Sequence, residues 1–366
     1  MGSPLKIRIH RLFRLFRRNS SHDLLRTEMN LPCPSTVKLR MMTALATEKF
    51  PEVALITGAT GLVGRALVEK IQRLSPQTEI RILTRSAQRS VQIGASQIQA
   101  FQWTPSLQKM DRAALEGVDC VVHLAGETVA QRWSAPVRAR IRSSRIDALN
   151  LIAKACESQS IAPRIISASA IGGYPSSHQP QEEPSAFGKG FIEDVVQDWE
   201  DAVAQLGAKG GGHVSLRIGL VLSPNGGVLH RLLPLYKLGL GSPLSPGSQW
   251  QSWIHIDDLT DLFVCAIQHR DWSGAYNAVS PYPVQQQEFS RTLAKTLSRP
   301  HFLPAVPAWA LQIAFGEAAH ALLASHRILP KRTLDSGFAF SYPTLEKAMH
   351  QLLHSKPLLA AQNAPH

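Results

Sequence analysis

Apolar and polar positions along the chain form blocks that predict strands separated by helices. The first block, residues 53–57, is apolar and β-branched, and an amphipathic stretch with helical spacing follows it. The other predicted strands are residues 79–83, 97–103, 118–127, 164–170, 214–222 and 276–279, and the predicted helices between them include residues 134–144, 147–157 and 191–206. This alternation predicts an α/β fold of the Rossmann type, with a doubly wound parallel sheet and right-handed crossovers.

The pattern changes after residue 222, where a stretch rich in Gly and Pro begins, and the positions from 285 onward are mostly helical. We therefore predict a Rossmann domain over residues 51–222 and a smaller, mostly helical C-terminal substrate lobe over residues 223–355. Residues 254–279 are expected to return to the Rossmann domain, with a helix that Asp257 or Asp258 caps. The predicted organisation is completed by a leader, residues 1–48, and a tail, residues 356–366.

A glycine-rich turn joins the first predicted strand to its helix. The segment Thr57-Gly58-Ala59-Thr60-Gly61-Leu62-Val63-Gly64 has the spacing Gly-x-x-Gly-x-x-Gly. In such a turn the first glycine permits a tight bend, the second a close approach of backbone to pyrophosphate, and the third close packing of helix on strand. The helix N-terminus then faces the phosphates. The predicted dinucleotide contacts are Thr57, Gly58, Thr60, Gly61, Leu62, Val63 and Gly64.

The end of the second predicted strand indicates which dinucleotide binds. NAD sites commonly place a carboxylate here to bind the ribose 2′-hydroxyl, but this chain has Thr84-Arg85-Ser86. Arg85 could pair with a 2′-phosphate, so we predict NADP(H), with Thr84 and Arg85 in contact; the alternative is that Arg85 is a solvated loop residue. After the fourth predicted strand, small residues suit a cofactor that passes close by, and the predicted contacts there are Leu124, Ala125, Gly126 and Glu127.

Charge adds information mainly about the leader. The net charge is +12, and residues 1–50 hold ten Lys or Arg against three Asp or Glu. The rest of the chain is only mildly basic and has no basic stripe interleaved with aromatics, so no nucleic-acid partner is predicted. The basic, amphipathic leader resembles an organellar transit peptide, the alternatives being a disordered extension or a start at Met41 or Met42. We expect a cytoplasmic protein, or a chloroplast or other organellar protein if residues 1–40 are a transit peptide.

Cysteines and apolar runs exclude other classes of protein. The four cysteines, Cys33, Cys120, Cys156 and Cys265, lie far apart without zinc-ligand spacing, so no metal site is predicted. No uncharged apolar run reaches the length that crosses a bilayer, which predicts no stable membrane insertion.

Successive motifs resemble those of the extended short-chain dehydrogenase/reductase superfamily, which contains sugar-nucleotide epimerases and dehydratases. They are Thr57-Gly58-x-x-Gly61-x-x-Gly64, His123-Leu124-Ala125-Gly126, Leu216-Arg217-Ile218-Gly219 and Ile254-His255-Ile256-Asp257-Asp258. The tail motif Leu329-Pro330-Lys331-Arg332, followed by Gly337-Phe338, is similar to that of the atypical epimerase-like family 39U. The resemblance covers about residues 53–353. It implies an NADP(H)-binding, epimerase-like oxidoreductase whose small-molecule substrate is unknown; a homodimer is a further expectation left open.

The acid/base pair of the superfamily is missing. Active members carry Tyr-x-x-x-Lys on the helix after the fifth strand, where this chain has Phe191 and Val195. The resemblance leaves Ser169 and Tyr174 as candidate catalytic residues. Candidates on the substrate side are Arg132, Arg145, Arg217 and His255. The missing pair also favours an alternative function, a non-catalytic NADP(H)-binding protein with a regulatory or assembly role, for instance in cell or organelle division.

Overall fold

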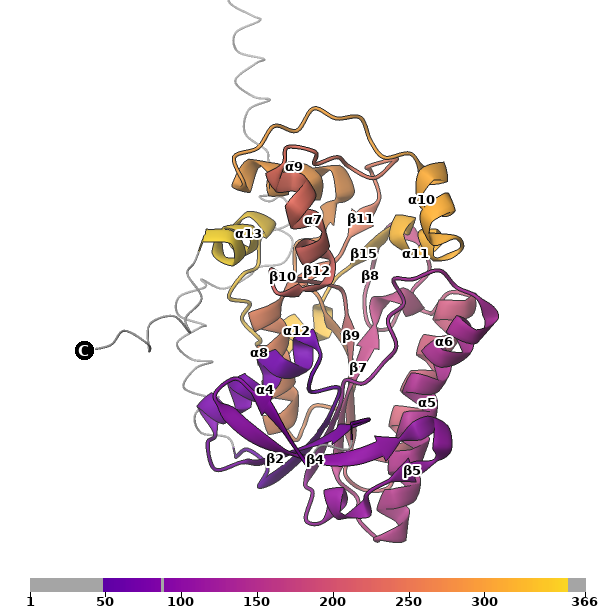
Figure 1. The fold of residues 1–366 in the computed structure, drawn as a ribbon, viewed down its shortest axis with the longest axis vertical. Coiled ribbons are helices and arrows are strands. Elements are labelled where there is room, and N and C mark those ends of the chain that lie inside the picture. Colours follow the sequence, from indigo (N-terminus) through magenta and orange to yellow (C-terminus); the bar gives the residue numbers. More distant parts are fainter. Residues whose placement is uncertain (1–48, 87–88, 355–366) are drawn as a thin grey trace, which may run out of the picture.

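The computed structural model describes residues 49–86 and 89–354, in which a mostly parallel nine-stranded sheet carries helices on both faces (Figure 1). The strand order is β13-β9-β7-β6-β1-β2-β4-β3, with β5 paired to β4. The strands are β1 (Val53–Thr57), β2 (Glu79–Thr84), β3 (Ser90–Ile93), β4 (Ser96–Thr104), β5 (Lys109–Met110), β6 (Cys120–His123), β7 (Arg164–Ala170), β9 (His213–Ile218) and β13 (Gly274–Ala278). The predicted Rossmann sheet is confirmed; only β3 and β5 run antiparallel to their neighbour β4.

The central strands β1, β6 and β7 are buried on both faces, which explains their continuous apolar runs. Helices α4 (Leu62–Leu74) and α8 (Ile256–Gln268) cover one face, where Ile56, Val122 and Ile166 join the core. Helices α5 (Ala135–Ser158) and α6 (Phe191–Gly207) cover the other, where the alternate residues Leu55, Val121 and Ile165 join a second core. The two cores share the sheet because successive side chains of a strand point to opposite faces.

Several predicted boundaries are wrong for local reasons. The two predicted helices over residues 134–157 are one helix, α5, and the β3–β4 hairpin was not predicted. The predicted strand 214–222 is two strands, because β10 (Leu220–Ser223) leaves the main sheet and pairs with β12 (Trp253–His255). Gly219 stands at this break, where a Cβ would lie 2.5 Å from the Ser252 carbonyl oxygen. The backbone just before β12 therefore approaches closely at this glycine, between β9 and β10.

The cap of α8 also differs from the prediction. His255, rather than Asp257 or Asp258, caps the helix, because His255 Nδ1 accepts the Asp257 N–H at 3.0 Å. Asp258 is buried instead, and its carboxylate accepts the N–H groups of Ser341 and Tyr342 at 2.7 and 2.9 Å. The carboxylate therefore fixes the C-terminal segment to α8.

The C-terminal lobe lies above the carboxyl ends of β7 and β9 in the view of Figure 1. Its main helices α7 (Gly227–Lys237), α9 (Gln286–Thr296) and α13 (Leu345–His354) enclose a third core that includes Leu229, Trp253 and Leu293. The remaining elements are β8 (Ser177–Gln181), β11 (Trp250–Gln251), β14 (Val284–Gln285), α10 (Ala308–Phe315), α11 (Ala318–Leu323), β15 (His326–Ile328), α12 (Lys331–Asp335) and the 3₁₀ turns η1 (Pro105–Leu107), η2 (Arg112–Leu115) and η3 (Ile171–Gly173).

Membrane-spanning helices and clusters of metal ligands were both searched for among the described residues. None of the helices there is long and apolar enough to cross a membrane. In the same residues, no group of three or more His, Cys, Asp or Glu side chains could hold a metal ion. The predicted leader and tail lie outside the described residues.

Candidate functional site

Two glycines of the turn between β1 and α4 stand where there is no room for a Cβ. Gly58 has a φ of +69°, and a Cβ there would lie 2.6 Å from the Leu124 carbonyl carbon. A Cβ on Gly64 would lie 2.3 Å from the Gly58 carbonyl oxygen. Gly61 donates its N–H to that oxygen at 3.0 Å and stands at the N-cap of α4 without a side-chain cap. The backbone at the helix N-terminus is therefore open to an anion, as a pyrophosphate site requires.

Thr57 connects this turn to the loop after β6. Its completely buried hydroxyl accepts the N–H groups of Leu124 and Ala125, both at 3.1 Å, and lies 2.9 Å from His123 Nδ1. Burial, with a contribution from the Arg145 guanidinium, lowers the pKa of His123 to about 3. The imidazole is therefore neutral, so the Thr57 hydroxyl can donate to Nδ1. Thr57 thus fixes the loop after β6 next to the glycine-rich turn.

Arg145 supports the loop after β6 from near the middle of α5. Its guanidinium donates to the carbonyl oxygens of Ile141 at 2.9 Å and Glu127 at 3.0 Å. A Cβ on Gly126 would lie 3.1 Å from the Arg145 Cζ, so this glycine admits the guanidinium beneath the loop. Burial lowers the pKa of Arg145 to about 10, although the electrostatic attraction of Glu127 raises it. Arg145 therefore remains charged at neutral pH and positions Glu127.

The residues predicted to select the cofactor lie at the carboxyl end of β2. Thr84 Oγ1 accepts the Ser86 N–H at 3.2 Å, which bends the chain as it leaves the strand. Arg85 is exposed, so its guanidinium is accessible to a ligand. At the start of α4, Arg65 Nε donates to the Thr60 carbonyl at 2.9 Å and connects the helix to the glycine turn.

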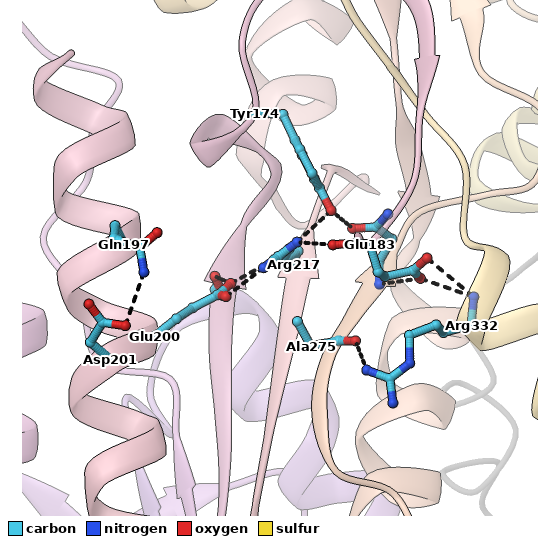
Figure 2. A network of polar contacts seen from close by, with 10 residues as sticks. Tyr174, Glu183, Gln197, Glu200, Asp201, Arg217, Ala275 and Arg332 are labelled. Atoms are coloured by element: carbon cyan, nitrogen blue, oxygen red, sulfur yellow. Dashed lines mark hydrogen bonds and ion pairs between the residues drawn. The ribbon is translucent and has the colours of Figure 1, made fainter. Parts of the chain in front are cut away.

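Ser169 and Tyr174 belong to a buried polar network centred on Arg217 and Glu200 (Figure 2). Arg217 donates Nε and Nη2 to the Glu200 carboxylate at 2.8 and 2.7 Å, and Nη1 to the Tyr174 hydroxyl at 2.6 Å. The Ser169 hydroxyl donates to Glu200 at 2.6 Å, and the Tyr174 hydroxyl donates to Asn277 Oδ1 at 2.9 Å. Both candidate hydroxyls thus already have acceptors within the protein.

Burial dominates the chemistry of this network. Tyr174 has no exposed surface, and its burial raises the pKa of the phenol. Burial also disfavours the charge of Arg217, but the hydrogen bonds and electrostatic attraction of Glu200 and Tyr174 together outweigh that effect and raise the pKa of the guanidinium. Arg217 therefore has a carboxylate partner of its own. Its predicted role on the substrate side remains a prediction.

The same network connects the sheet to the tail motif of the sequence. Arg217 Nη1 donates to the Glu183 carbonyl at 3.0 Å, and the Glu183 carboxylate accepts the N–H of Asn277 at 3.0 Å and that of Arg332 at 3.2 Å. The Arg332 guanidinium donates to the Ala275 carbonyl at 2.6 Å. Glu183, Glu200 and Asn277 were not among the residues predicted from the sequence. The sequence signal for Glu200 is a carboxylate next to Trp199, which lies on the apolar face of the predicted helix.

The two positions that replace Tyr-x-x-x-Lys are packed with apolar contacts. The Phe191 ring meets the edge of Trp133 at a centroid distance of 5.4 Å, and the Arg138 guanidinium lies 5.0 Å from its centroid. Val195 is buried against Val137 and Ile141. Neither side chain can donate a proton, so these positions stabilise the contact between α5 and α6.

The four substrate-side candidates do not meet at one place. Arg132 lies beside α10, where Nη1 donates to the Ile313 carbonyl at 3.3 Å, whereas Arg145 supports the β6–α5 loop and Arg217 lies in the network above. His255 caps α8, hydrogen-bonds Gln351 through Nε2 at 2.8 Å and stacks on Tyr342 at 3.9 Å. Burial lowers the pKa of His255, which keeps the ring neutral.

Comparisons with known proteins match two segments of the chain to families. Residues 54–279 match the NAD dependent epimerase/dehydratase family, and residues 306–352 match a domain of unknown function, DUF1731. The chain is 32% identical to the chloroplastic epimerase family protein SDR39U1 homolog of Arabidopsis thaliana, over 86% of this chain and 90% of that protein. It is 34% identical to the epimerase family protein Mb2239 of Mycobacterium bovis, over 81% of this chain and 96% of the relative.

A solved structure shares the whole architecture. The human epimerase family protein SDR39U1 (isoform 2), crystallised with NADPH, superposes with a TM-score of 0.74 at 28% sequence identity. The superposition covers 83% of this chain and 100% of the human chain. Both the sheet and the lobe above it therefore have counterparts in a protein that holds a nicotinamide dinucleotide.

Proposed function

Because the chain belongs to the NAD dependent epimerase/dehydratase family, we propose that it binds NADP(H) and acts as an epimerase-like oxidoreductase on a small molecule. The observation that carries the proposal is the turn at Gly58 and Gly64, where any Cβ would collide with backbone. Such a turn brings the backbone N–H groups of α4 up to a pyrophosphate. The NADPH in the human relative supports the choice of cofactor.

Particular residues would hold each part of the cofactor. The backbone of Gly61 and of the first turn of α4 would bind the pyrophosphate, and the exposed Arg85 would bind the 2′-phosphate. The loop from Leu124 to Glu127, supported by Thr57 and Arg145, would border the nicotinamide half. When bound, the nicotinamide supplies or accepts the hydride.

The proton that accompanies hydride transfer needs a separate donor, for which Ser169 and Tyr174 remain our candidates. Each hydroxyl would have to exchange its present acceptor, Glu200 or Asn277, for the substrate. Tyr174 would also have to become accessible, since it is completely buried.

These requirements favour a second candidate function, a non-catalytic NADP(H)-binding protein with a regulatory or assembly role. The supporting observation is that Phe191 and Val195 fill the positions of the usual acid/base pair with apolar contacts. In this candidate the cofactor would act as a ligand that stabilises the folded chain.

Two measurements on the purified chain separate these functions. Fluorescence titration should show tighter binding of NADPH than of NADH, and failure to bind either would contradict both candidates. NADPH oxidation should then be followed against a panel of aldehydes, ketones and keto acids. Turnover supports the oxidoreductase, whereas tight NADPH binding without turnover on any compound favours the non-catalytic protein.

We also propose that the basic leader directs the chain to an organelle. The supporting observations are its basic, amphipathic sequence and the word chloroplastic in the name of the Arabidopsis relative. Import of a fluorescent protein fused behind residues 1–48 into isolated chloroplasts and mitochondria tests this. A fusion that both organelles exclude would favour the cytoplasmic expectation.

A further inference from the structure

Arg327 differs from the other arginines that lie inside this fold. Arg164 donates to four backbone carbonyls, Arg217 to Glu200, Tyr174 and the Glu183 carbonyl, and Arg332 to two carbonyls. The Arg327 Nε is buried as well, yet it has no hydrogen-bond acceptor among residues 49–86 and 89–354. A buried donor without an acceptor is uncommon in folded proteins and calls for a specific explanation.

The Arg327 guanidinium is held in place by an aromatic ring. Its Cζ lies 4.6 Å from the centroid of the Trp250 ring. Trp250 is fixed in turn, because its backbone N–H donates to Ser325 Oγ at 3.1 Å and connects β11 to β15. Stacking occupies the face of a guanidinium and leaves its edge, with the N–H groups, directed in the plane. A planar acceptor such as a carboxylate, or the oxygens of a phosphate, match that edge.

Arg327 lies close to the segment that leaves the carboxyl end of β7. Its strand, β15, pairs with β8 in a register that places His326 beside Ser177. The two segments also meet before the strands begin, since the Ser325 N–H donates to Ser176 Oγ at 3.0 Å. Figure 1 shows β8, β11 and β15 above the carboxyl ends of β7 and β9, between α7 and the α10–α11 pair. In open α/β sheets, ligands bind outside the carboxyl ends of the strands.

We propose that Arg327, stacked on Trp250, is an anchor for an anionic group of the substrate, a carboxylate or a phosphate. The proposal deepens the proposed function and rests on it, because it assigns the substrate class of the same oxidoreductase. An outer amino group would meet the anion first, and the buried Nε would complete a parallel pair of hydrogen bonds once the atoms that cover it move aside. The rest of the molecule would extend toward the carboxyl ends of β7 and β9, where the nicotinamide would lie.

The test is calorimetric titration of the full chain with inorganic phosphate and, in a separate series, with acetate. The protein is saturated with NADPH, so that the cofactor fills its own phosphate-binding turn. We expect the wild type to bind one or both anions and Arg327→Gln to bind them at least tenfold more weakly. Arg291→Gln, an exposed position on α9, is the matched control and should bind as the wild type does. The preferred anion identifies a phosphate or a carboxylate substrate.

Two further variants test whether the charge of Arg327 and its stacking on Trp250 are both needed. Arg327→Lys keeps the charge but loses the paired donors, so an intermediate loss is expected, and Trp250→Leu should weaken anion binding by releasing the guanidinium. NADPH affinity should be unchanged in all of them. Wild-type protein that binds neither anion, or Arg327→Gln that binds both normally, would overturn the proposal. If the wild type fails to bind NADPH, the proposed function fails, and the same titrations on the cofactor-free chain still test Arg327 by itself.

Discussion

Glu200 accepts hydrogen bonds from both Nε and Nη2 of Arg217, and this paired contact joins α6 to β9 on one face of the sheet. Both side chains are largely buried, with 13% and 10% of their surfaces exposed. The pair also fixes the Ser169 hydroxyl and, through Arg217, the Tyr174 hydroxyl. A single ion pair therefore holds both candidate catalytic residues.

Glu200→Gln should strongly destabilise the chain, because it leaves the Arg217 charge buried without its carboxylate. Losing one partner of a buried pair costs about 3–5 kcal/mol of unfolding free energy. Asp198→Asn is the matched control on the same helix, since the pair of Asp198 with Arg142 is exposed by 38% and 51% and should contribute less than about 1 kcal/mol. Urea unfolding measures both, and equal losses would contradict the assigned role of Glu200.

Arg85→Ala should remove most of the preference for NADPH and leave NADH affinity almost unchanged. A charge-assisted contact of an arginine with a 2′-phosphate corresponds to roughly 10- to 100-fold in affinity. Arg73→Ala, an exposed position in the last turn of α4, should retain the wild-type preference. Fluorescence titration with both cofactors decides the matter, and an Arg85→Ala variant that still prefers NADPH would assign that preference to other residues.

Tyr174→Phe tests whether the buried Tyr174 hydroxyl has a catalytic role or only a structural one. If Tyr174 supplies the proton, turnover should fall on the order of 10²- to 10⁴-fold while NADPH affinity survives. Tyr236→Phe serves as the control, because its buried hydroxyl contacts Ser290 in the lobe and should affect stability only. A Tyr174→Phe variant with the parent's turnover would exclude Tyr174 from the mechanism and leave it a structural residue.

Asp258 should make the chain less stable as the pH rises. Burial raises the pKa of its carboxyl to about 7, although the two hydrogen bonds that the carboxylate accepts from backbone N–H groups lower it. The pKa of Asp in an unfolded chain is about 3.9. Between these values the folded state binds more protons than the unfolded state, so the free energy of unfolding falls as pH rises from about 4 to about 7 and then levels off. Asp258→Asn should lack this decline.

Urea unfolding of the wild type and Asp258→Asn at several pH values between these limits provides the measurement. Asp257, Asp261, Lys70 and His255 also lie near this carboxyl or its helix, and the difference between the two proteins largely removes their contribution. A difference that stays constant with pH would show that Asp258 is ionised throughout.

The sequence determined the fold more completely than the site. Residues 164–170 were predicted to be a strand and form β7, because an apolar run buried on both faces leaves little ambiguity. Strand 214–222 could not be predicted correctly, since its break at Gly219 depends on Ser252, which is distant in sequence. The polar network was missed for the same reason. Glu183, Glu200 and Asn277 come from three separate segments, and only the tertiary fold brings them to Arg217 and Tyr174.

The contact between Glu183 and Arg332 joins the two segments that match separate families. Residues 306–352 match a family of their own, yet Arg332 supplies a backbone donor to a carboxylate that also binds the edge strand β13. A chain cut before residue 306 would expose the buried Glu183 carboxylate and the apolar surfaces that residues 306–352 cover. Residues 306–352 are thus an integral part of the nucleotide-binding unit. Gene fusions or deletions that separate the two segments should yield insoluble protein rather than two working modules.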